Sequence, residues 1–190
     1  MDAECKGGRR THEREGPRQE SGSAAQRAVE PISPVKRLAV WVATGFGLGW
    51  SPVASGTAGT LLGVALVWLL PWTKWQAQLA LSAGLILVAI PACSVAEREF
   101  GVKDDSRIVA DEYTTFPLCL VGLPWGFHPW LLLTAFVVHR VLDIVKPFPA
   151  YRLQRLRGGA GIVADDVASS LYALGANHLL VALFPVLLAA

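Results

Sequence analysis

The chain has 190 residues, enough for one domain of ordinary size, and its formal net charge is only +2. Hydrophobic residues make up 53% of it and charged residues 17%, which excludes a disordered chain, and the balanced charge argues against nucleic-acid binding. Beyond residue 37 only nine basic and nine acidic residues remain, about half the charge density of a soluble domain. This composition favours a small membrane protein with a polar N-terminal segment.

Residues 1–34 are predicted to form a disordered charged tail, and residues 35–190 an integral-membrane domain. Gly, Ser, Gln, Arg and Glu dominate the tail, and no apolar segment follows its basic residues, which argues against a signal peptide. The three cysteines show no CxxC spacing, so neither a zinc site nor a disulfide framework is expected.

Apolar and charged blocks alternate through the rest of the chain. A glycine-rich loop at 45–59 precedes three apolar runs, 61–70, 79–96 and 167–190, which are typical of membrane helices. No period-2 alternation indicates strands. The predicted fold is therefore all-α: a compact bundle of apolar helices with membrane-spanning and re-entrant segments.

A fourth apolar block, 116–138, decides the topology. Proline and glycine break it at 123–129, and its length of about twenty-three residues is too short for two full spans. A single crossing would put the charged stretches before and after it, 97–112 and 139–166, on opposite sides. We expect the block instead to return to its starting side or to stay half-buried, so that the two stretches lie together. The basic tail predicts that they face the cytoplasm.

All nine acidic residues beyond residue 37 fall in these two charged stretches. Three adjacent pairs stand out: Asp104-Asp105, Asp111-Glu112 and Asp165-Asp166. Helical spacing would place Asp104 and Asp111 on one helix face, and Asp165-Asp166 could equally be a helix N-cap. Carboxylates gathered on one side repel one another unless a cation holds them, and ligand sets made only of oxygen suit Mg²⁺.

Basic residues accompany the acids. His139, Arg140, Asp143 and Lys146 recur at helical spacing, and Pro147 should end that helix. Arg140 with Asp143 fits an i,i+3 ion pair, whereas Arg140 with Lys146 fits a clamp for a phosphoryl group. His139 is better explained as a structural residue than as a catalytic one.

Glycine-rich stretches at 44–60 and 158–161 flank this chemistry. The first resembles a backbone anion nest that opens a helix, although close helix packing in a membrane uses the same small residues. It lacks the Gly-Lys-Ser/Thr ending of a nucleotide-binding loop.

Several blocks together resemble bacterial phosphatidylglycerophosphatase A: PVASGTAGT at 52–60, DSRIVADE at 105–112, RVLDIVKPFP at 140–149 and GGAGIVADD at 158–166. The resemblance covers roughly residues 38–180. It implies Mg²⁺-dependent hydrolysis of phosphatidylglycerophosphate, a phospholipid, to phosphatidylglycerol and phosphate in phospholipid biosynthesis. It also implies a multi-pass protein of the bacterial cell inner membrane, whose active site faces the cytoplasm.

The absence of Cys-x₅-Arg and Asp-x-Asp nucleophile motifs favours metal-assisted hydrolysis, and an aspartyl-phosphate intermediate stays open. The expected catalytic residues are Asp111, Glu112, Asp143, Asp165 and Asp166. The expected Mg²⁺ ligands are Asp104, Asp105, Asp111, Glu112, Asp165 and Asp166. The expected substrate-binding residues are Gly56, Thr57, Thr60, Arg140 and Lys146.

Three alternatives remain at this point. A small ion or anion transporter would spread ionisable residues through its spans, whereas these spans carry almost none. A non-catalytic membrane anchor would need no carboxylate cluster. Another phosphoryl-transfer enzyme of lipid metabolism is the nearest rival, and the oligomeric state is left open.

Overall fold

The computed structural model describes residues 32–68 and 74–188. Most of the predicted tail, 1–34, lies outside them. Every regular element among the described residues is helical, so the prediction of an all-α fold is confirmed. The α-helices are α1 (Pro34–Ala43), α2 (Ser55–Val67), α3 (Trp75–Phe100), α4 (Ala110–Thr115), α5 (Pro129–Val145), α6 (Ala150–Leu153) and α7 (Gly159–Leu183).

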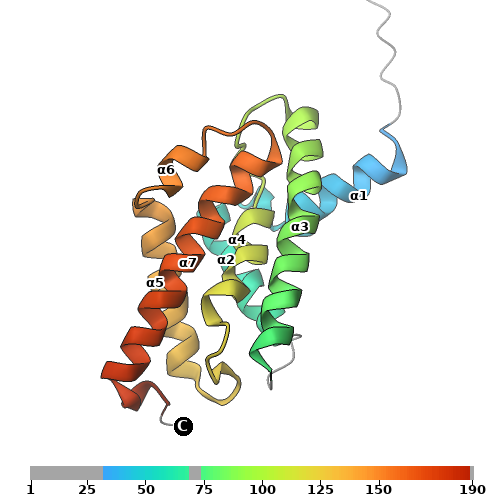
Figure 1. Ribbon diagram of the computed structural model, residues 1–190. Helices are drawn as coiled ribbons and strands as arrows, with labels where there is room; N and C mark the ends of the chain where they lie inside the picture. The colour runs from blue at the N-terminus through green and yellow to red at the C-terminus, as the bar shows by residue number, and fades with distance from the viewer. Residues whose placement is uncertain (1–31, 69–73, 189–190) are drawn as a thin grey trace, which may run out of the picture. The chain divides into compact units, whose positions relative to one another are not determined.

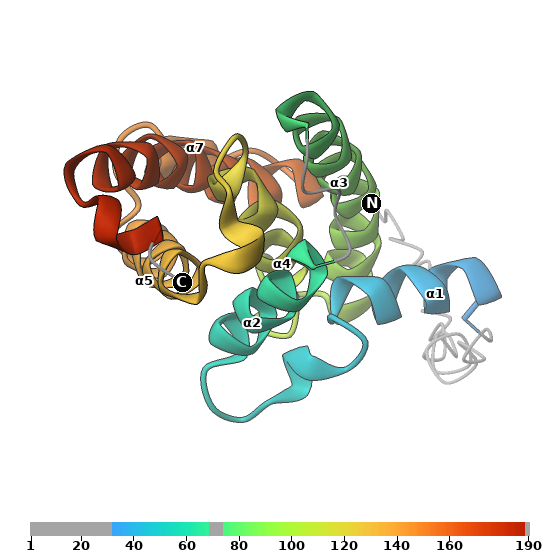
Figure 2. The same ribbon diagram turned by 90° about the horizontal axis from the view of Figure 1, so that it is seen from below.

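The long helices α3, α5 and α7 run side by side, and the short helix α4 lies inside the bundle (Figures 1 and 2). Helix α4 packs against α2, α3 and α7, while α1 packs against α3 and α5 against α7. The predicted site residues lie on α2, α4, α5 and α7, in the loop 101–109 and, for Lys146, directly after α5. Helices α2 and α7 pack on α4, and α5 packs on both of them.

One described helix, α3, is long and apolar enough to cross a membrane by length and composition. Helix α2 has 13 residues, fewer than the roughly 20 that a full span needs, and the end of the apolar run predicted at 61–70 lies outside the described residues. Trp75 and Trp130, both exposed, begin α3 and α5 at the same end of the bundle (Figure 1). Exposed tryptophans at helix ends are typical of a membrane–water interface.

The predicted reversal within 116–138 is present. After α4 the chain forms the 3₁₀ turn Phe116–Leu120, turns at residues 121–128, and returns along α5 (Figure 1). Side chains of neighbouring helices satisfy the irregular backbone: the Asn177 amide donates to the Cys119 carbonyl at 3.1 Å, and the Gly122 N–H donates to Gln78 Oε1 at 2.8 Å. Irregular backbone inside an apolar bundle requires such partners.

Two local predictions were wrong. Helix α7 begins at Gly159 instead of about residue 167, so Asp165 and Asp166 lie in the helix interior and are not its N-cap. Asp104 lies in the loop 101–109 with a φ of +53°, so it does not share a helix face with Asp111. Close packing of Gly159 on α3 allows the earlier start of α7, and the loop 101–109 separates Asp104 from α4.

Gly159 explains why α7 can begin so early. A Cβ at this position would lie 2.0 Å from the backbone oxygen of Ile90 and 2.6 Å from the backbone nitrogen of Ser94, both on α3. The Gly159 N–H also donates to the Ser94 hydroxyl at 2.8 Å, which satisfies one of the free N–H groups of the first turn. The glycine therefore fixes the distance at which α7 approaches α3.

We expect Gly159→Ala to destabilise the protein by about 2–3 kcal/mol, because the new methyl group meets backbone atoms and forces α7 away from α3. Gly175→Ala is the matched control on the same helix, since a Cβ there meets nothing within 4 Å. The control should be neutral or stabilise by up to about 1 kcal/mol. Thermal unfolding in detergent measures both, and equal midpoints for the two variants would contradict the proposed contact.

Candidate active site

The two charged stretches of the sequence meet in a single cavity of about 330 Å³, here called the acid cavity. Helix α4 contributes its first turn, α5 its last turns, α7 its second turn, and the loop 101–109 forms the rim. The charged residues that line it are Asp104, Asp105, Asp111, Glu112, Arg140, Asp143, Lys146 and Asp166. Gly56 also lines the cavity, so nine of the predicted site residues are brought together.

Four carboxylate groups in and beside the acid cavity carry a buried oxygen without a hydrogen-bond partner among the described residues. These oxygens are Asp111 Oδ1, Glu112 Oε2, Asp165 Oδ1 and Asp166 Oδ2. A buried anionic oxygen without a donor is costly, because nothing replaces the water it has lost. Protons or a bound cation would stabilise these oxygens.

Burial and mutual repulsion act on these groups in the same direction. Burial raises the pKa of Glu112 to about 8, and the charges of Asp166 and Asp143 add to the effect. Burial also raises the pKa of Asp111 and of Asp166 well above the usual range; the charge of Glu112 adds to the effect at Asp111, and that of Asp111 adds to it at Asp166. Neighbouring carboxylates that disfavour each other's ionisation are a feature of functional sites.

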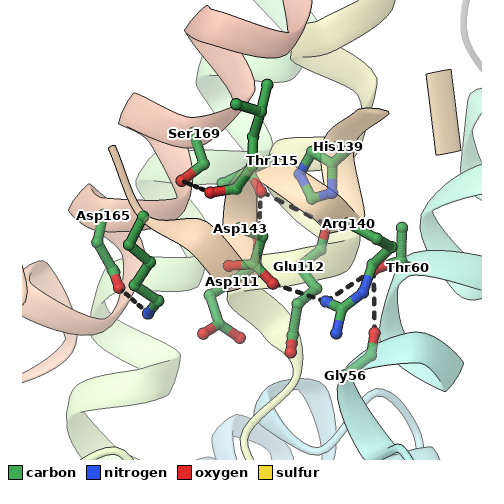
Figure 3. A network of polar contacts seen from close by, with 12 residues as sticks. Gly56, Thr60, Asp111, Glu112, Thr115, His139, Arg140, Asp143, Asp165 and Ser169 are labelled. Carbon is green, nitrogen blue, oxygen red and sulfur yellow. Dashed lines mark hydrogen bonds and ion pairs between the residues drawn. The ribbon is translucent and has the colours of Figure 1, made fainter. Parts of the chain in front are cut away.

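Arg140 is one of the two basic residues that line the acid cavity. Its Nη1 donates to Asp143 Oδ2 at 2.7 Å and lies 3.5 Å from the Thr60 hydroxyl, which in turn donates to the Gly56 carbonyl at 2.9 Å (Figure 3). The ion pair predicted from the i,i+3 spacing is therefore present. It fixes one edge of the guanidinium group and leaves the rest of its N–H groups for a ligand.

Lys146 directly follows α5, and its side chain connects this end of the helix to α7. Its ammonium group forms an ion pair with the buried carboxylate of Asp165. The residue has a φ of +47°, which is uncommon outside glycine and persists only where the surrounding contacts hold it. Of these two predicted residues, Lys146 lines the acid cavity, whereas Asp165 lies behind it, 2% exposed.

Helix α2 approaches the acids through its glycines. A Cβ at Gly56 would lie 2.4 Å from Glu112 Oε1 and 3.2 Å from Arg140 Nη2, and one at Gly59 would lie 2.9 Å from the Cβ of Val109. The glycine-rich stretch does open a helix, as predicted, and its small residues allow α2 and α4 to pack closely.

The remaining predicted substrate-binding residues on α2 differ from Gly56. Thr60 is fully buried and its hydroxyl is held between the Gly56 carbonyl and Arg140, so it positions Arg140. Thr57 lies half-buried in the first turn of α2 and does not belong to the lining of the acid cavity.

The two acids of the rim are already engaged. Asp105 accepts two hydrogen bonds from the Arg107 guanidinium, both at 2.7 Å, and this contact lowers the pKa of Asp105. Asp104 accepts from the Gln154 amide at 3.0 Å and is exposed. Sequence reasoning missed Arg107 and Gln154; the i,i+2 spacing of Asp105 and Arg107 was the signal that could have indicated the first.

His139 has the structural role that we expected. It is fully buried, its Nε2 lies 3.0 Å from the Ser170 hydroxyl, and its ring packs edge-on against Phe116. These contacts join α5 to α7 beneath the acid cavity.

The donor chemistry of the site fits a hard cation, since Asp111, Glu112, Asp165 and Asp166 each offer an unpartnered carboxylate oxygen. No group of three or more His, Cys, Asp or Glu side chains in the described ranges is, however, already arranged as a metal site. A cation would therefore have to draw the carboxylates together or share them with a bound ligand.

The family model for phosphatidylglycerophosphatase A matches residues 41–181 of the chain. The chain is 32% identical to phosphatidylglycerophosphatase A of Escherichia coli over 70% of its own length and 78% of that protein's. It is 36% identical to phosphatidylglycerophosphatase A of Haemophilus influenzae, over 75% of its length and 86% of that protein's.

A third relative, from Bacteroides thetaiotaomicron, bears the name "Putative phosphatidylinositol-3-phosphatase" and is 37% identical over 71% of this chain and 88% of that protein. No solved structure matches the chain. The match to the family model spans all of the acid cavity and most of the described helices, and two relatives carry the family name over two thirds or more of their length. The chain therefore belongs to the phosphatidylglycerophosphatase A family, and it is a phosphoric monoester hydrolase.

Proposed function

We propose that this enzyme removes the terminal phosphate of phosphatidylglycerophosphate, which gives phosphatidylglycerol and inorganic phosphate in phospholipid biosynthesis. One observation carries the proposal: a single cavity combines buried carboxylates that lack partners with an arginine already held in place. Membership of the family, and the name of two of its relatives, support the choice of substrate.

We propose Mg²⁺ as the cation. The residues that would hold it are Asp111, Glu112 and Asp166, with Asp165 beside them, because their free oxygens are the ligand type that Mg²⁺ takes. Asp104 and Asp105 are engaged at the rim by Gln154 and Arg107, so we place them outside the first coordination sphere. When bound, Mg²⁺ supplies charge neutralisation at the phosphate oxygens and a water of lowered pKa.

The chain's own residues bind and orient the phosphate. Arg140 would donate hydrogen bonds to the phosphate oxygens with the N–H groups that its contact with Asp143 leaves available. Asp143 and Thr60 hold the guanidinium in place and so reduce the entropy lost on binding. In the reaction the oxygen of a water molecule bonds to phosphorus. The bond between phosphorus and the oxygen of the terminal glycerol carbon breaks, and that leaving oxygen takes up one proton.

A second substrate is phosphatidylinositol 3-phosphate, which the name of the Bacteroides thetaiotaomicron relative suggests. Both lipid headgroups contain the same three consecutive carbons. The first bears the phosphodiester, the second a free hydroxyl group and the third the phosphomonoester. A cavity that recognises this unit would accept either headgroup. The inositol ring is larger than glycerol, so the space around the cavity would determine which of the two lipids binds better.

The purified full-length protein in detergent micelles tests the proposal. We expect it to release inorganic phosphate from phosphatidylglycerophosphate faster than from phosphatidylinositol 3-phosphate, to stop in the presence of EDTA, and to recover when Mg²⁺ is added back. The same rate with and without chelator would contradict the metal, and no phosphate release from phosphatidylglycerophosphate would contradict the substrate.

We further propose that the protein is a multi-pass protein of the inner membrane whose acid cavity faces the cytoplasm. Exposed tryptophans lie at one end of the bundle and charged loops at the other, which supports a bundle whose two ends lie at opposite membrane–water interfaces. With Cys5 replaced by serine, Ser106→Cys should react with a membrane-impermeant maleimide from the cytoplasmic side, and Lys74→Cys only from the outside. Reaction of both from the same side would contradict this orientation.

A further inference from the structure

A second polar cavity, of about 250 Å³, adjoins the acid cavity and is here called the basic cavity. It is lined by Lys103, Asp104, Tyr151, Gln154 and Arg155. Asp104 lines both cavities, so a single ligand that extends across this residue could occupy both cavities at once. The mechanism proposed above makes no use of the basic cavity.

The basic cavity offers two free positive charges. Lys103 and Arg155 are exposed, and neither forms an ion pair with any residue in the described part of the chain. The Arg155 guanidinium lies 5.6 Å from the centre of the Tyr151 ring, a cation–π contact that limits its motion without neutralising it. Unpaired cations beside a cluster of carboxylates indicate a site for an anionic group.

Asp104 is held between the two cavities as a hydrogen-bond acceptor. Its left-handed backbone conformation, with a φ of +53°, is one that aspartate tolerates better than most residues. One carboxylate oxygen accepts from the Gln154 amide at 3.0 Å. The remaining lone pairs point to no other donor among the described residues and can accept a hydroxyl group of a ligand.

We propose that the basic cavity binds the phosphodiester of the same lipid whose phosphomonoester enters the acid cavity. This inference rests on the proposed function and deepens it. The recognised unit is a row of three carbons: the outer two carry the phosphomonoester and the phosphodiester, and the middle one carries a hydroxyl group. Lys103 and Arg155 bind the phosphodiester, and Asp104 accepts a hydrogen bond from the hydroxyl between the two phosphates. Lipids with a phosphomonoester alone, such as phosphatidic acid, fill only the acid cavity.

The experiment compares steady-state kinetics of Lys103→Gln and Arg155→Gln with those of the unaltered protein on phosphatidylglycerophosphate in neutral detergent micelles. Each variant is expected to raise KM roughly tenfold with little change in kcat, the order of effect of one lost charge-assisted hydrogen bond. The inhibition constant of inorganic phosphate, which needs only the acid cavity, is expected to stay the same. Arg157→Gln is the matched control, since Arg157 is exposed in the same segment but does not line the basic cavity.

The outcomes separate this inference from the proposed function. If the unaltered protein releases no phosphate from phosphatidylglycerophosphate, the proposed substrate fails, and the same variants are then compared on phosphatidylinositol 3-phosphate, which presents the same unit. An unchanged KM for Lys103→Gln and Arg155→Gln on the lipid that is hydrolysed overturns the inference. So does an equal rise in KM for Arg157→Gln, or a parallel rise in the inhibition constant of phosphate, because either result reports general attraction of anions.

Discussion

Asp111→Asn and Asp166→Asn are each expected to lower kcat at least a thousandfold, which corresponds to about 4 kcal/mol of transition-state stabilisation. Both carboxylates line the acid cavity, and each has a buried oxygen that no described residue satisfies. Asparagine keeps the size of the side chain but removes an anionic oxygen that a Mg²⁺ ion would require. Phosphate release from phosphatidylglycerophosphate measures the loss.

In the presence of EDTA, which removes any bound cation, the same substitutions should leave the free energy of unfolding unchanged or increase it. Burial and the charges of neighbouring carboxylates raise the pKa of both carboxyl groups, so their charged forms oppose folding when no cation is bound. Glu99→Gln is the control: Glu99 forms a surface ion pair with Lys36 at 3.0 Å, away from the acid cavity, and its loss should change neither property measurably.

Activity and thermal unfolding together distinguish a functional carboxylate from a structural one. A variant that is inactive but unfolds at the original temperature or above supports a role in the reaction. A variant that loses activity because it unfolds, or one that keeps its turnover, removes that residue from the proposed metal site.

The sequence predicted the elements whose pattern is local. The helical spacing of Arg140 and Asp143 is confirmed by α5, which ends at Val145. Lys146, predicted on the same helix, is instead the left-handed residue that follows it, before Pro147. The break at 123–129 correctly predicted that the chain returns, because proline and glycine there cannot continue a helix. The gathering of the charged stretches followed from that reversal, and the acid cavity confirms it.

The errors arose where tertiary contacts overrule local pattern. Gly158 to Gly161 suggest a loop when they are considered alone, but Gly159 starts a helix because it packs directly on the backbone of α3. No local pattern indicates the contact between the Thr60 hydroxyl and Arg140, because the two residues lie 80 positions apart in the chain. The role of Thr60 in substrate binding stays a prediction. The roles of the acids in binding Mg²⁺ and in catalysis stay predictions.

Arg140→Lys is expected to lower kcat/KM about a hundredfold while the protein keeps its fold. Lysine preserves the positive charge beside Asp143, but it cannot donate to the carboxylate and to phosphate oxygens through one rigid planar group. The guanidinium group contacts both the Asp143 carboxylate and the Thr60 hydroxyl, with N–H groups left over for phosphate. A single ammonium group cannot make all of these contacts from one position. Kinetics on phosphatidylglycerophosphate, with circular dichroism to confirm folding, measure the effect.

Arg140→Gln separates binding of phosphate from support of the structure. It leaves the carboxylate of Asp143, 8% exposed, without its cation, which should destabilise the protein by about 1–3 kcal/mol. The double variant Arg140→Gln/Asp143→Asn removes that buried charge and should recover most of the stability, but none of the activity. Recovery of phosphate release in the double variant would mean that Arg140 serves only to neutralise Asp143, and the proposed contact between Arg140 and the phosphate would then be wrong.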